Sequence, residues 1–169
     1  MSVMNGTLEH ESKGKRALAL IACIAAPILL GFLSSALSGD MEAMYDSLNL
    51  PPLSPPNQLF GIVWPIMYAL MGIAFYLVIR EHTDAHLKRM AVVFYIIQLV
   101  LNIFWSPVFF GGDAFVPASV IIIAMDILTA ITIRYFLAVR RAAGYLLVPY
   151  LVWLLFATYL SIGVAVLNP

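Results

Sequence analysis

The chain has 169 residues, of which 63% are hydrophobic and 11% are charged, and its mean hydropathy is +0.97. A soluble domain needs far more charge to cover its surface, so this composition excludes an ordinary soluble protein. The formal net charge of zero gives no indication of nucleic-acid binding. The single cysteine, Cys23, builds neither a disulfide framework nor a thiolate metal site, and we expect it to be a small residue of the apolar interior.

Apolar segments long enough to cross a membrane follow one another along the chain. A bilayer core of roughly 30 Å needs about 20 apolar residues per helix. The candidate segments are 17–37, 57–79, 90–110, 115–139 and 142–167. They predict an all-α integral membrane protein with one domain, a five-transmembrane-helix bundle over 17–167, preceded by a cytoplasmic tail at 1–16. Strands are disfavoured because the runs are too long and lack two-residue alternation.

The first segment has a second interpretation, a cleaved signal peptide. Basic residues precede it, and Ala36, Leu37 and Ser38 form a possible cleavage site. Its apolar stretch is long for a signal peptide, which favours a membrane helix. The residues alone leave both interpretations open.

Basic residues divide the predicted connections into two kinds. All nine lie on one side of a five-span topology: Lys13, Lys15, Arg16, Arg80, Lys88, Arg89, Arg134, Arg140 and Arg141. The opposite side carries Asp40, Glu42, Asp46 and Asp113 and no Lys or Arg. The positive-inside rule therefore predicts a cytoplasmic N-terminus and a C-terminus outside. Adding or removing one span would destroy this partition, so the partition supports five spans.

The first connection, 38–56, is longer than the others at nineteen residues. It is acidic early and rich in proline late, with Pro51, Pro52, Pro55 and Pro56. Proline stiffens a loop that lacks regular hydrogen bonds, and long loops in compact folds are usually functional or disordered. We expect a semi-rigid lid across the outer mouth of the bundle, with an inert linker as the alternative.

Helical spacing places aromatic and amide side chains on shared faces. These faces hold Phe60, Trp64, Tyr68, Met71 and Phe75 in the second segment, Gln98, Asn102, Trp105 and Phe109 in the third, and Tyr150, Trp153, Ala157 and Ser161 in the fifth. The fourth carries Asp126 near its midpoint. Polar groups at membrane depth usually face the interior, so these faces predict a pocket for a flat, largely apolar ligand. For Gln98, Asn102 and Asp126 the alternative is a hydrogen bond that only holds helices together.

Three of the prolines inside predicted helices are candidates for kinks. Pro65 is expected to kink the second helix near Gly61, and Pro107 and Pro149 are candidates for kinks in the third and fifth. Kinked helices can open a cavity between them, or they can be inert features of packing.

Several motifs occur together in a fixed order. They are Tyr45-Asp46-Ser47-Leu48, Pro51, Ser54-Pro55-Pro56, Phe60, Val63-Trp64 and Tyr68, then Gln98-Leu99, Leu101-Asn102, Trp105-Ser106 and Phe109-Phe110, then Leu146 to Trp153 and Phe156-Ala157. Over about 17–167 this pattern resembles the TspO/MBR family, which comprises the translocator proteins (peripheral benzodiazepine receptors) and tryptophan-rich sensory proteins. The resemblance is to a bacterial member, which implies the bacterial cell membrane. It also makes the first segment a true helix.

The resemblance implies a five-helix bundle, usually a homodimer, with a pocket under the first loop. It implies binding of tetrapyrroles such as protoporphyrin IX and haem, and of synthetic ligands of the benzodiazepine-receptor type, with no required cofactor. Ligand contacts carry over to Tyr45, Pro55, Asn102 and Ala157. Some bacterial members promote light-dependent oxidative breakdown of protoporphyrin, and the tryptophans implicated there match Trp64 and Trp153.

The family pattern is not matched everywhere. Met44 stands where a Trp is usual, Leu50 replaces a common Lys, Leu53 a common aromatic residue and Pro65 a common Thr. The lid is therefore poorer in aromatic groups and cations than is usual in the family, which implies a weaker hold on an acidic porphyrin.

Three functional hypotheses follow. The first is a receptor, sensor or transporter of tetrapyrroles that needs no metal of its own. Its candidate ligand-binding residues are Tyr45, Pro55, Phe60, Trp64, Tyr68, Gln98, Asn102, Trp105, Asp126, Tyr150, Trp153 and Ala157. The second is an unconventional enzyme that degrades porphyrin with light and oxygen, with Trp64 and Trp153 as catalytic residues. The third is a membrane scaffold. No predicted span contains a His, and we expect His82 and His86 to be a surface pair rather than a metal site.

Overall fold

The computed structural model describes residues 13–169, so most of the predicted tail at 1–16 lies outside the described residues. The elements in chain order are α1 (Lys13–Ala36), α2 (Met41–Ser47), α3 (Gln58–Arg80), α4 (Ala85–Ser106), the π-helix η1 (Pro107–Gly111), α5 (Phe115–Val139), α6 (Arg141–Leu146) and α7 (Val148–Leu167). Within this part of the chain, five helical segments are long and apolar enough to cross a membrane, with α4–η1 and α6–α7 each forming one span. The expected all-α, five-helix membrane fold is confirmed.

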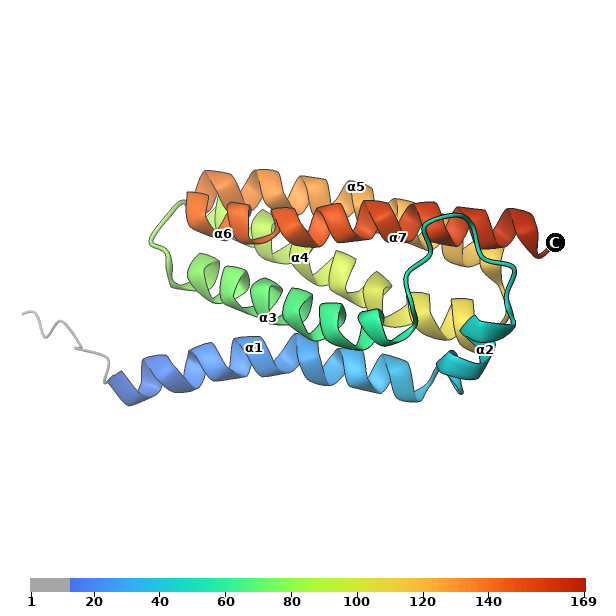
Figure 1. The fold of residues 1–169 in the computed structure, drawn as a ribbon. Coiled ribbons are helices and arrows are strands. Elements are labelled where there is room, and N and C mark those ends of the chain that lie inside the picture. The colour runs from blue at the N-terminus through green and yellow to red at the C-terminus, as the bar shows by residue number, and fades with distance from the viewer. Residues whose placement is uncertain (1–12) are drawn as a thin grey trace, which may run out of the picture.

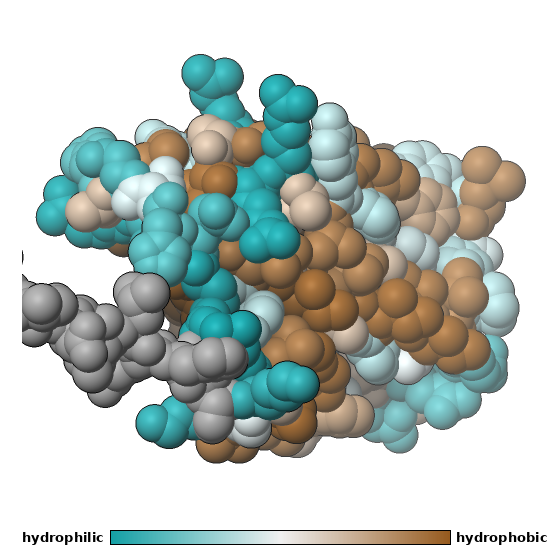
Figure 2. Space-filling view, turned by 90° about the vertical axis from the view of Figure 1, so that its left-hand side faces the viewer, coloured by the Kyte–Doolittle hydropathy of each residue, from teal (hydrophilic) through white to brown (hydrophobic). Residues whose placement is uncertain are grey.

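The spans run side by side along one axis (Figure 1). Helix α4 packs against α5, α5 packs against α7, and α1 lies on the outside against α3 and α4. Helix α2 and the connection that follows it lie at the same end of the bundle as the C-terminus. The opposite end carries the start of α1 and the α3–α4 and α5–α6 connections, where the basic residues gather. Figure 2, which views this end, shows hydrophilic residues beside a hydrophobic flank.

Two glycines allow α1 and α3 to approach closely. A Cβ atom on Gly72 of α3 would collide with the backbone of Cys23 and Ile24 in α1. A Cβ atom on Gly31 of α1 would collide with the ring of Tyr68. Membrane helices commonly use small residues in this way, because close backbone approach replaces the hydrophobic driving force that water supplies to soluble proteins.

The three prolines have different local effects. Pro65 does not interrupt α3, which continues from Gln58 to Arg80. Pro107 begins the π-helix η1, the kind of local irregularity that frequently occurs at functional sites. Pro149 lies in the first turn of α7, after the helix break at Leu147, where its missing N–H group is tolerated.

The first connection contains a short helix that the sequence analysis did not predict. The Oδ1 atom of Asp40 accepts a hydrogen bond of 3.0 Å from the backbone N–H of Ala43 and so caps α2. Residues 48–57 then return to the start of α3 without regular structure. We refer to residues 38–57 as the lid.

Substituting Gly72 tests whether close packing of α1 on α3 stabilises the bundle. We expect Gly72→Ala to lower the free energy of unfolding by about 1–3 kcal/mol, because the colliding atoms are backbone and cannot rotate away. The control is Gly61→Ala in the same helix, where an added Cβ meets nothing within 4 Å. Unfolding in detergent would be followed by circular dichroism. Equal stability of the two variants would contradict the prediction.

Candidate ligand-binding cavity

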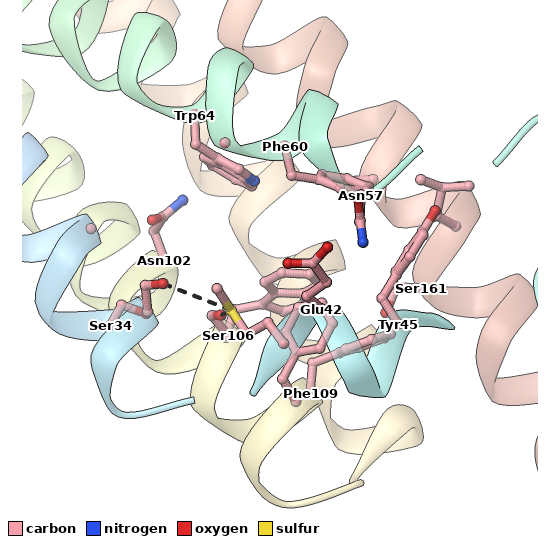
Figure 3. Close-up of a pocket in the computed structure, with 18 of the residues that line it drawn as sticks. Ser34, Glu42, Tyr45, Asn57, Phe60, Trp64, Asn102, Ser106, Phe109 and Ser161 are labelled. Atoms are coloured by element: carbon pink, nitrogen blue, oxygen red, sulfur yellow. Dashed lines mark hydrogen bonds between the residues drawn. The ribbon is translucent and has the colours of Figure 1, made fainter. Parts of the chain in front are cut away.

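A cavity of about 400 Å³ lies beneath the lid, between α1, α3, α4, η1 and α7. Seven of the predicted ligand-binding residues line it: Tyr45, Phe60, Trp64, Tyr68, Asn102, Trp105 and Ala157. Figure 3 shows Trp64 and Phe60 of α3 on one side, with Ser106 and Phe109 across from them and Asn102 towards the interior. The structure thus brings together side chains from three of the faces that helical spacing had indicated.

Aromatic rings form two walls of this cavity. On the α3 side, Trp64 stacks on Tyr68 with ring centroids 5.6 Å apart. On the opposite side, Trp105 stacks on Phe109 at 5.1 Å. Tyr45 of the lid meets Phe60 edge-on at 5.4 Å, so the lid extends the aromatic surface over the mouth. Such a surface suits a flat ligand, because each ring offers a face or an edge for stacking.

A chain of buried hydrogen bonds fixes the inner end of the cavity. The Tyr68 hydroxyl donates to Oδ1 of Asn102 at 2.7 Å, and Nδ2 of Asn102 donates to the Tyr150 hydroxyl at 3.0 Å. The Tyr150 hydroxyl in turn donates to Oε1 of Gln98 at 3.0 Å. Tyr68 and Asn102 line the cavity, whereas Gln98 and Tyr150 lie behind them. The chain therefore orients the two cavity residues and ties α3, α4 and α7 together.

Three other predicted residues also lie outside the cavity wall. Pro55 belongs to the lid, and its carbonyl oxygen accepts a hydrogen bond from the Tyr45 hydroxyl. Trp153 packs behind the wall, against the edges of Phe60 at 5.8 Å and Trp64 at 6.5 Å between ring centroids. Asp126 accepts a 2.7 Å hydrogen bond from Thr158, and its helix α5 contributes no residue to the cavity. In this structure the Asp126 bond joins α5 to α7.

One cavity residue has an unused hydrogen-bond donor. The indole Nε1 of Trp105 is buried and has no partner among residues 13–169. A buried donor without a partner costs free energy, so a side-chain shift that let a ligand acceptor reach this N–H would recover that cost. Sequence reasoning placed Trp105 on the correct face but did not identify its N–H as available.

The sequence analysis missed the contribution of α1 and, apart from Tyr45, that of α2. Ser34 and Gly31 of α1 and Met41 and Glu42 of α2 line the cavity. Helix α1 carries no inward polar pattern among its apolar residues, so nothing in its sequence distinguished the face that meets α3 and α4. Helix α2 is too short for a periodicity argument.

The lid is held closed at its inner edge by its own polar groups. Burial raises the pKa of the Tyr45 phenol above its ordinary value, so its hydroxyl remains protonated and donates to the Pro55 carbonyl at 2.8 Å. The amide of Asn57 donates to Oδ1 of Asp46 at 3.3 Å. These bonds join α2 to the start of α3.

The lid is also joined to the C-terminal end of α7. The backbone N–H of Asn49 donates to Oδ1 of Asn168, and Nδ2 of Asn168 donates back to the Asn49 carbonyl, each at 3.0 Å. The Tyr159 hydroxyl donates to the Pro52 carbonyl at 2.7 Å. The ring of Pro51 packs where Gly163 has no side chain. We call the paired bonds between Asn49 and Asn168 the asparagine clamp.

The fold and the site define a class: a multi-pass helical membrane protein whose cavity is closed by a proline-rich lid. The sequence model of the TspO/MBR family matches residues 23–167, and the chain belongs to the TspO/MBR family. It is 35% identical over 156 residues to tryptophan-rich protein TspO of Chlorobaculum tepidum, covering 92% of this chain and 99% of that protein. It is 37% identical over 152 residues to tryptophan-rich protein TspO of Archaeoglobus fulgidus, covering 89% and 97%.

The similarity extends to animal proteins. The chain is 35% identical over 138 residues to the translocator protein of Homo sapiens, covering 80% of this chain and 82% of that protein. The family membership expected from the motifs is thereby confirmed.

Substituting Asn102 tests the buried hydrogen-bond chain. We expect Asn102→Leu to lower the free energy of unfolding by about 1–3 kcal/mol, because it leaves the Tyr68 hydroxyl buried without an acceptor. Adding Tyr68→Phe to that variant removes the stranded hydroxyl and should recover part of the loss. Unfolding of the two single variants and the double variant, compared as a double-mutant cycle, measures the coupling. Additive effects would show that the chain contributes no stability.

Proposed function

We propose that this protein is a membrane receptor, sensor or transporter that binds tetrapyrroles, such as protoporphyrin IX and haem, and other flat apolar ligands. The observation that carries the proposal is the aromatic cavity of about 400 Å³ under the lid, within the range of roughly 300–1,000 Å³ typical of small-molecule sites. Membership of a family that includes tryptophan-rich sensory proteins and translocator proteins supports it. Synthetic ligands of the benzodiazepine-receptor type share the same chemistry.

The cavity residues have distinct roles in this proposal. The macrocycle would lie between the Trp64–Tyr68 pair and the Trp105–Phe109 pair, where each aromatic contact contributes about 0.5–1.5 kcal/mol beyond the burial of area. The Asn102 amide would meet polar atoms of the ligand, as would the unpartnered Trp105 N–H after a shift of its side chain. Most affinity then comes from burial, and orientation comes from these two groups.

A second candidate function is the breakdown of bound porphyrin by light and oxygen. It is favoured by one observation: the indole of Trp64 lines the cavity and meets that of Trp153 edge-on, 6.5 Å away. Two oxidisable rings are thus in contact beside the bound ligand. The porphyrin would act as photosensitiser and molecular oxygen as oxidant, with Trp64 and Trp153 as the redox-active residues.

A porphyrin titration, first in the dark and then under light, tests both functions and the scaffold alternative. We expect protoporphyrin IX to quench tryptophan fluorescence at micromolar concentrations, because the three tryptophans all lie in or against the cavity wall. We expect Trp64→Leu to weaken binding by about tenfold. The control is Phe104→Leu, which removes a 59% exposed aromatic side chain from the outer face of α4.

The outcomes separate the hypotheses. Absence of quenching and of a shift in porphyrin absorbance would reject tetrapyrrole binding and leave the scaffold interpretation. A porphyrin spectrum that bleaches only with both light and oxygen, and is stable in the Trp64→Phe/Trp153→Phe variant, would establish degradation. A stable spectrum in the native protein under light would reject it.

The orientation of the chain belongs to the same proposal. The basic end of the bundle faces the cytoplasm, so the lid and its cavity open on the outer side of the membrane. Labelling of single cysteines in a Cys23→Ser background with a membrane-impermeant reagent should modify a cysteine in the lid, such as Ser47→Cys, and spare one in the α3–α4 connection, such as Thr83→Cys. The reverse pattern would overturn the orientation.

The proposal also includes a homodimer, which light scattering of the detergent-solubilised protein would detect.

A further inference from the structure

Glu42 is the one charged residue among those that line the cavity in the described part of the chain. It lies in the first turn of α2, and Figure 3 shows its carboxylate among the cavity side chains. Among residues 13–169 this carboxylate has no hydrogen-bond or ion-pair partner. No Lys, Arg or His of the described chain contributes to the cavity wall. The site therefore carries an unpaired negative charge.

The surroundings of Glu42 strengthen its effect. Asp40 and Asp46 lie on the same short helix and its cap, and neither is paired with a cation in the described structure. The basic residues lie at the other end of the spans, about 35 Å away for a helix of the length of α3. That separation exceeds the Debye length of roughly 8–10 Å, so these cations do not neutralise the mouth of the cavity.

Three hydrogen-bond donors of the lid are already in use. The hydroxyl of Tyr45 donates to Pro55, the hydroxyl of Ser54 donates to Pro51, and the amide of Asn57 donates to Asp46. A ligand carboxylate at the mouth would meet the like charge of Glu42, with no cation of the described chain in the cavity wall to offset it. A carboxylate turned towards the interior would be buried without a cation, which is costlier still.

We propose that Glu42 makes this cavity selective for flat ligands that are neutral or carry a cationic or hydrogen-bond-donating group, against ligands that carry carboxylates. The inference rests on the proposed function and ranks its ligands. Tetrapyrroles whose acidic side chains are masked or absent, and apolar amines, bind more tightly than porphyrin dicarboxylates such as protoporphyrin IX and haem, which still bind. Such a charge mainly affects the discrimination between ligands. It repels a ligand that carries a carboxylate, and it adds no contact to a neutral ligand.

The test compares protoporphyrin IX with its dimethyl ester, which is neutral at the same positions. Dissociation constants would be measured by tryptophan quenching in nanodiscs of uncharged lipid at low salt, for the native protein and for Glu42→Gln. We expect the ester to bind about tenfold more tightly than the diacid to the native protein. We expect this ratio to fall to about threefold or less in Glu42→Gln. The difference in hydrophobicity between the two ligands is the same whichever protein binds them. The change in the ratio of dissociation constants between the two proteins therefore measures the effect of the Glu42 charge.

Two further variants sharpen the comparison. Glu42→Lys should bring the ratio below that of Glu42→Gln, because the new charge attracts the diacid. Asp113→Asn is the matched control: it removes one negative charge at the same end of the bundle but outside the cavity wall, and Asn tolerates the positive φ of 47° found there. It should leave the native ratio unchanged.

Each outcome decides between the two proposals. If both porphyrins bind and the ratio is the same in the native protein and in the two Glu42 variants, the selectivity proposal is wrong while tetrapyrrole binding stands. Tighter binding of the diacid by the native protein would also overturn it. If neither porphyrin binds the native protein, the proposed function itself fails, and the inference about its substrate class fails with it.

Discussion

The hydrogen-bond chain from Tyr68 through Asn102 and Tyr150 to Gln98 is the constraint on which the site depends. In the hydrocarbon region no water can replace a lost partner, so these four polar side chains must meet one another inside the bundle. Their meeting fixes the rotation of α3, α4 and α7 about their own axes. Once the rotations of α3 and α4 are set, Trp64 and Trp105, each one turn from a member of the chain, both line the cavity.

Much of this arrangement follows from sequence, because hydropathy sets the spans and the 3.6-residue period sets which side chains share a face. Asn102 and Trp64 could be assigned to the cavity on those grounds. Sequence could not show which polar residues line the cavity and which lie behind its wall, because that depends on the neighbour that each one meets. Gln98 and Tyr150 support the wall from behind, and Asp126 pairs with Thr158 between α5 and α7. Helix α2 was missed because its stability comes from the Asp40 cap and from burial of Tyr45.

The two ends of the molecule are chemically opposite, and this polarity links membrane insertion with recognition. The basic residues gather at one end of the bundle, which is the pattern that the positive-inside rule describes. The lid end of the described chain therefore has no cations of its own. An apolar cavity that opens at an acidic end has a negative electrostatic potential at its mouth, whichever ligand it binds. The distribution of charge on which the proposed orientation rests is therefore also the one on which the proposed ligand selectivity rests.

The asparagine clamp joins the lid to a side chain one residue from the last residue of this sequence. Anything fused after Pro169, including a purification tag or a fluorescent reporter, would begin beside the contact that keeps the cavity covered. Ligand exchange rates obtained with such fusions would reflect the appended segment as well as the protein. The start of α1 at Lys13 lies at the other end of the bundle, away from that contact.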